Sequence, residues 1–285
     1  MKKIAIIFNP KAGSGGRTLL KRIMQKLSSA NKVELFETKA KGDATEIAKR
    51  ESEYFDIIVV AGGDGTINEV INGIDLNKKL GIIPLGTANV LAIEAGIKND
   101  VQSICALIEQ ATAQRIYIPT INNKKFLLMT GIGYDADIIH HTNPYLKKIF
   151  GKATFIFLGL MKWFKLKKYT ITVEADQHVV TGNWVLITNA KHYAGPYKIT
   201  NSTTIFQDNI VCYVFNNLSR IDILYYIFLI LFYGDLNKSK KITKIISKNI
   251  KISSLDKINV QCDGEKYGTL PVEINYKSET VRLIS

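Results

Sequence analysis

The sequence has little of what would indicate a secreted, metal-stapled or membrane-spanning protein. It has only three cysteines in 285 residues, and no pair of them has Cys-x-x-Cys spacing. This scarcity argues against a disulfide framework and a zinc cluster, and it favours a reducing compartment. The longest apolar run, residues 223–233, is too short for the roughly 20 residues of a bilayer-spanning helix. We therefore predict no membrane span.

The N-terminal segment also lacks the pattern of a signal peptide. Two lysines precede an apolar run of residues 4–8, which is shorter than the roughly 7–15 residues of an h-region. The run meets Asn9-Pro10 instead of a small-residue cleavage site. We therefore expect a cytoplasmic protein.

Acidic residues are few relative to basic ones, 25 against 38, and the formal net charge is +13. Such a surplus predicts an anionic partner, which could be nucleic acid, nucleotide phosphates or an acidic membrane face, although a merely basic surface is the alternative. Charged residues make up 22% and apolar ones 46%, a balance that excludes wholesale disorder. The length predicts two domains or one large one.

The order of the predicted elements divides the chain near residues 115–122. Up to that point strand and helix patterns alternate, and the apolar run 56–61 is typical of a parallel strand buried on both faces. This order predicts an open, doubly wound α/β sheet with ligands at the carboxyl ends of its strands. Beyond it, short β-rich runs separated by turns predict an antiparallel sandwich or barrel. Helical stretches at 145–167 and 221–233 interrupt these runs.

Three glycine-rich turns each follow a predicted strand and precede a helix: residues 9–16 (NPKAGSGG), 62–66 (GGDGT) and 84–89 (PLGTAN). Glycine lets backbone N–H groups approach an anion, and a helix N-terminus attracts negative charge. The first turn alone is equally consistent with a plain turn. In the second turn, a purely structural Asp-Gly turn with Thr66 as the N-cap of the next helix would explain Gly65 and Thr66. It would not explain why residues 62 and 63 are also glycine. Three such turns on one sheet edge predict a nucleotide-sized anion site.

These turns, read as Asn-Pro-x-x-Gly, Gly-Gly-Asp-Gly-Thr-x-Asn-Glu and Pro-x-Gly-Thr-x-Asn, resemble the catalytic domain of diacylglycerol kinases. The bacterial soluble lipid kinases in this group also include sphingosine kinase relatives. Gly133-Tyr134-Asp135 and Asp263-Gly264-Glu265 match two further motifs, so the resemblance covers nearly the whole chain. NAD kinases share the second turn alone.

The resemblance implies a Rossmann-like N-terminal domain (1–118) and a C-terminal antiparallel β-sandwich (119–273), with the active site in the cleft between them. A last strand, about 274–285, would return to the first domain. The implied cofactors are ATP and Mg²⁺. The residues implied to bind nucleotide are Asn9, Pro10, Lys11, Ala12, Gly13, Thr38, Gly62, Gly63, Asp64, Gly65, Thr66, Ile67, Asn68, Glu69 and Thr87.

The resemblance also implies catalytic and metal-binding roles. Glu265 would accept the proton of the lipid hydroxyl, with Asp263 beside it, although a solvated acid in a hairpin turn is the alternative. Phosphoryl transfer needs charge neutralisation, so Asp64 is the candidate for organising the catalytic Mg²⁺ and its waters. Asp135 would join this network or serve as a turn carboxylate. A structural Mg²⁺ would be bound by Asp208 and the backbone carbonyls of Ile205 and Ile210.

The sequence departs from the family pattern after the third turn and around Asp208, where Ser202 and Thr204 stand in place of Pro and Ala. Val90 and Ile93 stand where the family often has Asp and Arg, and Asn209 replaces a glycine beside Asp208. Diacylglycerol is the expected substrate; a sphingoid base, another lipid alcohol, or an inactive lipid-binding protein are the alternatives. No motif supports nucleic-acid binding.

Two stretches predict contact with an anionic membrane surface: the basic, aromatic-rich residues 145–167, and the apolar residues 224–233 with the lysines that follow. The alternative is that their apolar sides pack on the sandwich. We expect a peripheral protein at the cytoplasmic face of the membrane, and a homodimer stays open as an assembly.

Overall fold

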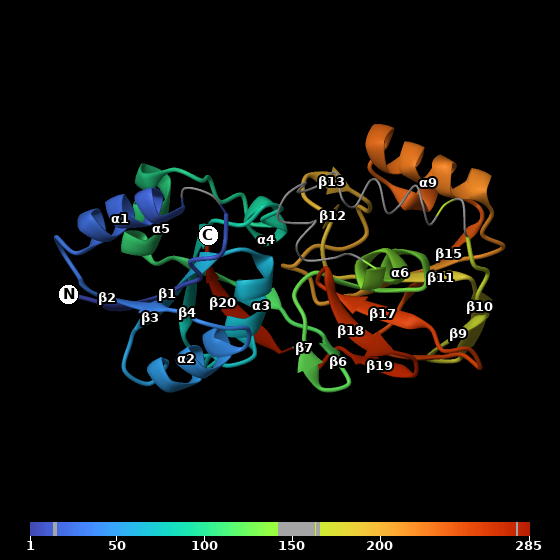
Figure 1. The fold of residues 1–285 in the computed structure, drawn as a ribbon, viewed down its shortest axis with the longest axis horizontal. Helices are drawn as coiled ribbons and strands as arrows, with labels where there is room; N and C mark the ends of the chain where they lie inside the picture. The colour runs from blue at the N-terminus through green and yellow to red at the C-terminus, as the bar shows by residue number, and fades with distance from the viewer. Residues whose placement is uncertain (14–15, 142–162, 164–165, 278) are drawn as a thin grey trace. The chain divides into compact units, whose positions relative to one another are not determined.

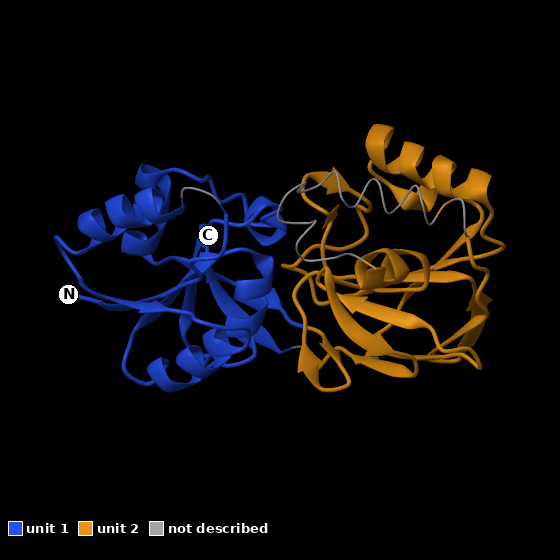
Figure 2. Cartoon of the chain, viewed as in Figure 1, with its two compact units in different colours: residues 1–118, 278–285 blue, residues 119–277 orange. Residues whose placement is uncertain are grey.

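The computed structural model describes residues 1–13, 16–141, 163, 166–277 and 279–285. The chain divides into two compact units (Figure 2). Unit 1 comprises Met1–Ile118 and Ser278–Ser285, and unit 2 comprises Pro119–Lys277.

Unit 1 is built on a sheet with strand order β2-β1-β3-β4-β20-β5 among the described residues. Neighbouring strands are parallel, except that β5 runs antiparallel to β20. The last strand of the chain thus lies in the sheet of the first unit. The strands are β1 (Lys3–Phe8), β2 (Lys32–Glu37), β3 (Ile57–Gly62), β4 (Lys79–Pro84), β5 (Ala113–Tyr117) and β20 (Thr280–Ile284).

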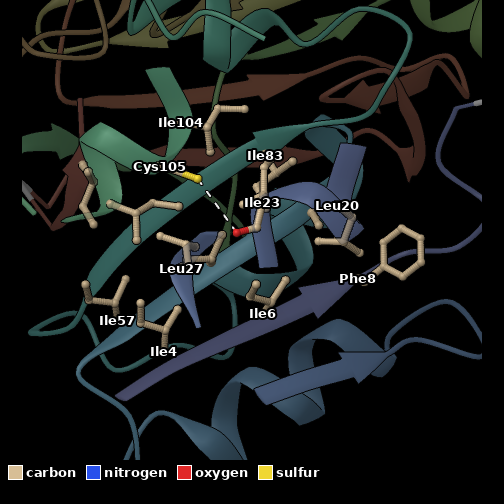
Figure 3. Close-up of a cluster of buried hydrophobic side chains, with 14 of the residues drawn as sticks. Ile4, Ile6, Phe8, Leu20, Ile23, Leu27, Ile57, Ile83, Ile104 and Cys105 are labelled. Atoms are coloured by element: carbon tan, nitrogen blue, oxygen red, sulfur yellow. Dashed lines mark hydrogen bonds between the residues drawn. The ribbon is translucent and has the colours of Figure 1, made fainter. Parts of the chain in front are cut away.

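Helices cover both faces of this sheet, with α1 and α5 on one face and α2 and α3 on the other (Figure 1). Because side chains alternate along a strand, Ile4, Ile6 and Phe8 of β1 all face one core (Figure 3). Leu20 and Ile23 of α1 close that core. The helices are α1 (Gly16–Leu27), α2 (Asp43–Glu51), α3 (Asp64–Ile71), α4 (Val90–Glu94) and α5 (Val101–Gln110).

Unit 2 contains two antiparallel sheets, with orders β10-β9-β16-β19-β6-β7 and β15-β14-β11-β8-β17-β18 among the described residues. The strands of the first sheet are β6 (Thr120–Ile121), β7 (Lys124–Lys125), β9 (Ile171–Ala175), β10 (His178–Gly182), β16 (Asn249–Ser253) and β19 (Val272–Asn275). Those of the second are β8 (Met129–Ile132), β11 (Trp184–Thr188), β14 (Val211–Phe215), β15 (Ile242–Ile246), β17 (Asn259–Cys262) and β18 (Glu265–Thr269).

The remaining elements among the described residues of unit 2 lie outside the two sheets. They are a short ribbon of β12 (His192–Tyr193) and β13 (Tyr197–Lys198), the helices α6 (Tyr134–His141) and α9 (Arg220–Phe232), and the 3₁₀ turn η1 (Leu236–Lys238). The helix predicted at 221–233 corresponds to α9, whereas α6 was not predicted. The helix predicted at 145–167 lies outside the described residues, apart from residues 163, 166 and 167.

The fold class predicted from the sequence is confirmed: a doubly wound α/β unit and an antiparallel β unit. All three cysteines are buried and free. In the part of the chain that the structure describes, no helix has both the length and the apolar character needed to cross a bilayer.

Candidate active site

The first and second glycine turns are joined by Asn9 at the end of β1. Its side-chain amide donates to the hydroxyl of Thr66, 3.0 Å away, and its side-chain oxygen accepts from the backbone N–H of Lys11. The backbone N–H of Asn9 donates to the carbonyl of Ala61 in β3. Asn9 therefore fixes the path of the first turn against the start of α3.

The third turn is in close contact with the other two. Gly13 has a φ of +64°, and a Cβ there would lie 2.2 Å from the carbonyl oxygen of Leu85. A Cβ on Gly63 would lie 3.0 Å from the Cα of Gly86. No larger residue fits at these points without moving the backbone. The structure therefore brings the three turns together at the carboxyl ends of β1, β3 and β4.

Asp64 connects the second turn to the third. Its two carboxylate oxygens accept hydrogen bonds from the backbone N–H groups of Val90 and Leu91, both at 3.0 Å. The N-cap residue of α4, Asn89, makes no side-chain cap, so Asp64 supplies the cap from another element. Burial raises the pKa of Asp64, while the amide hydrogen bonds oppose that shift. The carboxylate is thus held rigidly beside the turns.

The N-terminus of α3 faces the same region. Gly63 is its N-cap residue and no side chain caps the helix there. Gly65 is half-buried in the first turn of this helix. Unpaired N–H groups and the helix dipole make such an end a site for phosphate. The local sequence therefore builds an anion site from the backbone.

The other residues predicted to bind nucleotide differ in what they can offer. Lys11 and Thr87 are exposed, whereas Thr38, at the end of β2, is buried and donates its N–H to the carbonyl of Phe8. Ile67 is 2% exposed, so its side chain belongs to the core. The half-buried members of the set are Pro10, Ala12, Asn68 and Glu69.

Asp263 and Glu265 of unit 2 have distinct surroundings. Asp263 and Gly264 both have positive φ and form the two-residue turn between β17 and β18. The Asp263 carboxylate accepts from the backbone N–H groups of Leu127, Leu128 and Met129 at 2.7–3.0 Å. Glu265 is exposed at the start of β18. Asp263 therefore fastens the turn, and Glu265 is the carboxylate that solvent can reach.

Asp135 lies buried at the start of α6. The indole N–H of Trp184 donates to one of its oxygens and the side-chain amide of Gln261 to the other, both at 2.9 Å. Burial raises the pKa of Asp135 to about 6, against these hydrogen bonds. The side-chain oxygen of Gln261 accepts from the N–H of Gly264. Gln261 therefore links Asp135 to the turn that precedes Glu265.

The residues around Asp208 do not fit a bound Mg²⁺ well. The ammonium of Lys248 donates to the Asp208 carboxylate at 2.8 Å. Ile205 and Ile210 are buried, and the Asn209 side chain bonds both Thr203 and Ser202. Mg²⁺ requires a strict octahedron of oxygens, which an ammonium at its one carboxylate opposes.

Comparison with known proteins decides the family. The domain described as the diacylglycerol kinase catalytic domain matches residues 3–121, and the YegS C-terminal NAD kinase beta sandwich-like domain matches residues 129–285. A protein of Staphylococcus epidermidis named diacylglycerol kinase is 30% identical over 284 residues, covering 95% of this chain and 88% of that protein. The chain belongs to the diacylglycerol kinase family. A Staphylococcus aureus protein of the same name is 29% identical over 280 residues.

Solved structures agree on the fold of this kinase. The crystal structure of a diacylglycerol kinase from Bacillus anthracis str. Sterne has a TM-score of 0.82 and 24% identity, covering 99% of this chain and 96% of that one. The enzyme class that the resemblance implied, a kinase, is confirmed by the family.

Sequence reasoning missed several residues that shape the site. Asn89 has a φ of +48°, accepts from the N–H of Gly86 and donates to its carbonyl, and so closes the third turn. Its position at the end of a Gly-x-x-Asn turn was the available signal. No sequence signal pointed to Gln261 or Lys248, because only folding brings their hydrogen-bond partners close to them.

Proposed function

We propose that this kinase transfers the γ-phosphate of ATP to the hydroxyl of a membrane lipid, and that the lipid is diacylglycerol. One observation carries the proposal: the three glycine turns are held together at one edge of the unit 1 sheet, as a phosphate site requires. The relatives named diacylglycerol kinase supply the acceptor.

In unit 1, backbone N–H groups of the turns bind the phosphates of ATP. The N-termini of α1 and α3 favour this negative charge. When bound with ATP, Mg²⁺ would neutralise part of the phosphate charge. Both oxygens of Asp64 already accept amide hydrogen bonds, so we assign it an outer contact to the metal through water. The nucleotide-binding set is the one named from the sequence, with Ile67 contributing backbone only.

In unit 2, Glu265 accepts the proton of the lipid hydroxyl as its oxygen bonds to the γ-phosphorus. The bond between that phosphorus and the bridging oxygen of ADP breaks, and ADP leaves. The exposure of Glu265 and the fixing of its turn by Asp263 support this division of roles. Asp135 positions the turn through Gln261.

We also propose that the enzyme works as a peripheral protein at the anionic inner face of the membrane. The net charge of +13 supports this, since basic groups near an anionic surface each contribute about 1 kcal/mol of attraction.

Radiolabel transfer from ATP to a panel of lipids tests the proposal. The panel contains diacylglycerol, monoacylglycerol and a sphingoid base in mixed micelles, with NAD as a control acceptor. We expect Mg²⁺-dependent label on diacylglycerol and none on NAD. Label chiefly on the sphingoid base would make it the substrate. A folded protein that labels no lipid would overturn the kinase assignment of these turns.

A further inference from the structure

The helix α9 has an unusual distribution of side chains. Two contacts fix its inner face to unit 2. The ring centroid of Tyr226 lies 5.0 Å from that of Phe215, and the carboxylate of buried Asp222 lies 2.6 Å from the ammonium of Lys241. Ser219 and Asp222 form a capping box at its N-terminus. The helix is therefore anchored on one side and capped at its start.

The opposite face of α9 is apolar and exposed. We call it the α9 outer face; it consists of Ile221, Leu224, Ile227, Phe228, Leu231 and Phe232. Ile221 is 77% exposed and Phe232 is 72% exposed. An ordinary surface helix carries polar residues on its outer face, and monomeric proteins rarely expose large contiguous apolar patches. This face therefore needs an apolar partner.

The ends of the α9 outer face carry basic and aromatic groups. Arg220 begins the helix, and Lys238 lies with its ammonium 4.0 Å from the ring centroid of Tyr233 just beyond its end. Lys198 lies beside Gly234 there. An apolar helix face with aromatic residues and flanking cations is typical of a helix lying in a membrane interface.

We infer that the α9 outer face inserts into the interfacial layer of an anionic bilayer and lies parallel to its plane. Thirteen residues span about 20 Å, which is short of the roughly 30 Å hydrocarbon core. A two-fold dimer through this face would place the patch against itself. It would also bring Arg220, Lys198 and Lys238 of both copies together, and their like charges would repel. Anionic lipid headgroups complement these cations.

The inference rests on the proposed function in one respect: a diacylglycerol kinase must reach an acceptor that resides in a bilayer. It adds a component of binding that electrostatics alone does not provide. At about 1 M salt the Debye length is about 3 Å, so attraction to surface charge is screened whereas apolar insertion persists.

Vesicle flotation with the full-length protein tests this inference. The probes are phosphatidylcholine vesicles with and without phosphatidylglycerol, at low and high salt. The test variant is Phe228→Ser/Phe232→Ser. The matched control is Val179→Ser/Leu255→Ser, which removes two apolar side chains elsewhere in unit 2 that are on average even more exposed. Thermal unfolding establishes that both variants fold.

We expect the wild type and the control to keep part of their binding to anionic vesicles at high salt. The α9 variant should lose at least about tenfold in partitioning, since each buried Phe is worth about that factor or more. Equal binding by variant and wild type would overturn the inference. A wild-type dimer that the variant converts to monomer without loss of vesicle binding would overturn it too, in favour of a second copy.

Activity separates this inference from the proposed function. The α9 variant should phosphorylate a water-soluble, short-chain diacylglycerol at the wild-type rate while losing activity on vesicle-embedded diacylglycerol. Vesicle binding that depends on α9 in a protein without any lipid kinase activity would refute the proposed function and leave the inference intact.

Discussion

The carboxylate of Asp64 accepts a hydrogen bond from the backbone N–H of Leu91, 3.0 Å away, and so ties the second glycine turn to the helix that follows the third. Val90 donates to the other oxygen. One side chain thus performs the capping that Asn89, the N-cap residue of α4, does not supply. The spacing of the turns depends on this contact.

Asp64→Asn should reduce both activity and stability. The amide keeps the shape of the side chain, but its NH₂ group faces a backbone N–H that the carboxylate accepted from. We expect a stability loss of about 1–3 kcal/mol for the lost hydrogen bond. If Asp64 contacts Mg²⁺ through water, turnover should fall about 10–100-fold. Thermal unfolding and steady-state kinetics measure the two effects.

Asp100→Asn is the matched control for this change. Asp100 caps α5 in the same unit, accepting from the N–H of Ser103, and lies outside the three turns. It should leave turnover unchanged. Asp64→Asn with reduced stability and full turnover would make Asp64 a cap only.

The turn between β17 and β18 separates a structural carboxylate from a reactive one. Glu265→Gln should lower turnover by about 10²–10⁴-fold, the usual contribution of a general base, and leave the melting temperature unchanged. Asp263→Asn should instead lower the free energy of unfolding by about 3 kcal/mol or more, because three backbone N–H groups lose a charged acceptor. Kinetics and urea unfolding of both variants measure these effects.

Glu174→Gln is the control, since Glu174 is an exposed glutamate of β9 in the same unit. Full turnover in Glu265→Gln would assign the turn a structural role and leave the proton to water or phosphate.

The ion pair of Lys248 and Asp208 decides the question of a structural Mg²⁺. Both side chains are about half exposed, so Lys248→Met should cost at most about 1 kcal/mol. We expect the melting temperature of the wild type to be the same in Mg²⁺ and in EDTA. Lys248→Met should become stabilised by Mg²⁺, since the ammonium that competes with a metal for this carboxylate is then removed.

Lys248→Met/Asp208→Asn controls for this effect and should lose any response to Mg²⁺. If Mg²⁺ stabilises the wild type and Asp208→Asn abolishes that response, the implied metal site is present after all.

The sequence predicted the architecture because apolar periodicity is a local signal. The run at 56–61 became β3, which is buried throughout, and the helix at 221–233 became α9. Strands with polar or short patterns were missed. β18 reads Glu-Lys-Tyr-Gly-Thr, and β10 ends in Thr-Gly, so neither has an apolar face that the periodicity could detect.

The site was only partly predictable for a similar reason. Glycine turns after strands mark where an anion can bind, and that placement follows from sheet topology. The partner of a carboxylate depends on tertiary structure. Nothing local distinguishes Asp263, which binds three amides 134–136 residues away, from Glu265, which is exposed two residues later.

The raised pKa of Asp135 predicts that the free energy of unfolding depends on pH. Burial raises its pKa from 3.8 to about 6 in the folded protein. Between these values the folded state retains a proton that the unfolded state has lost, so the free energy of unfolding falls as the pH rises through that window. A rise in pKa of this size corresponds to roughly 3 kcal/mol, and the loss is complete about one unit above the folded pKa, near pH 7.

Asp135→Asn tests this, because an amide does not titrate. The difference in free energy of unfolding between wild type and variant, measured with urea, cancels the groups that titrate alike in both. We expect that difference to shift against the wild type by roughly 3 kcal/mol from about pH 3 to about pH 7 and to stay constant at higher pH. Because Trp184 and Gln261 both donate to this side chain, the variant also loses one hydrogen bond at every pH, which offsets the difference by a constant. A difference that does not change with pH would mean that Asp135 is ionised throughout, held by its two donors despite its burial.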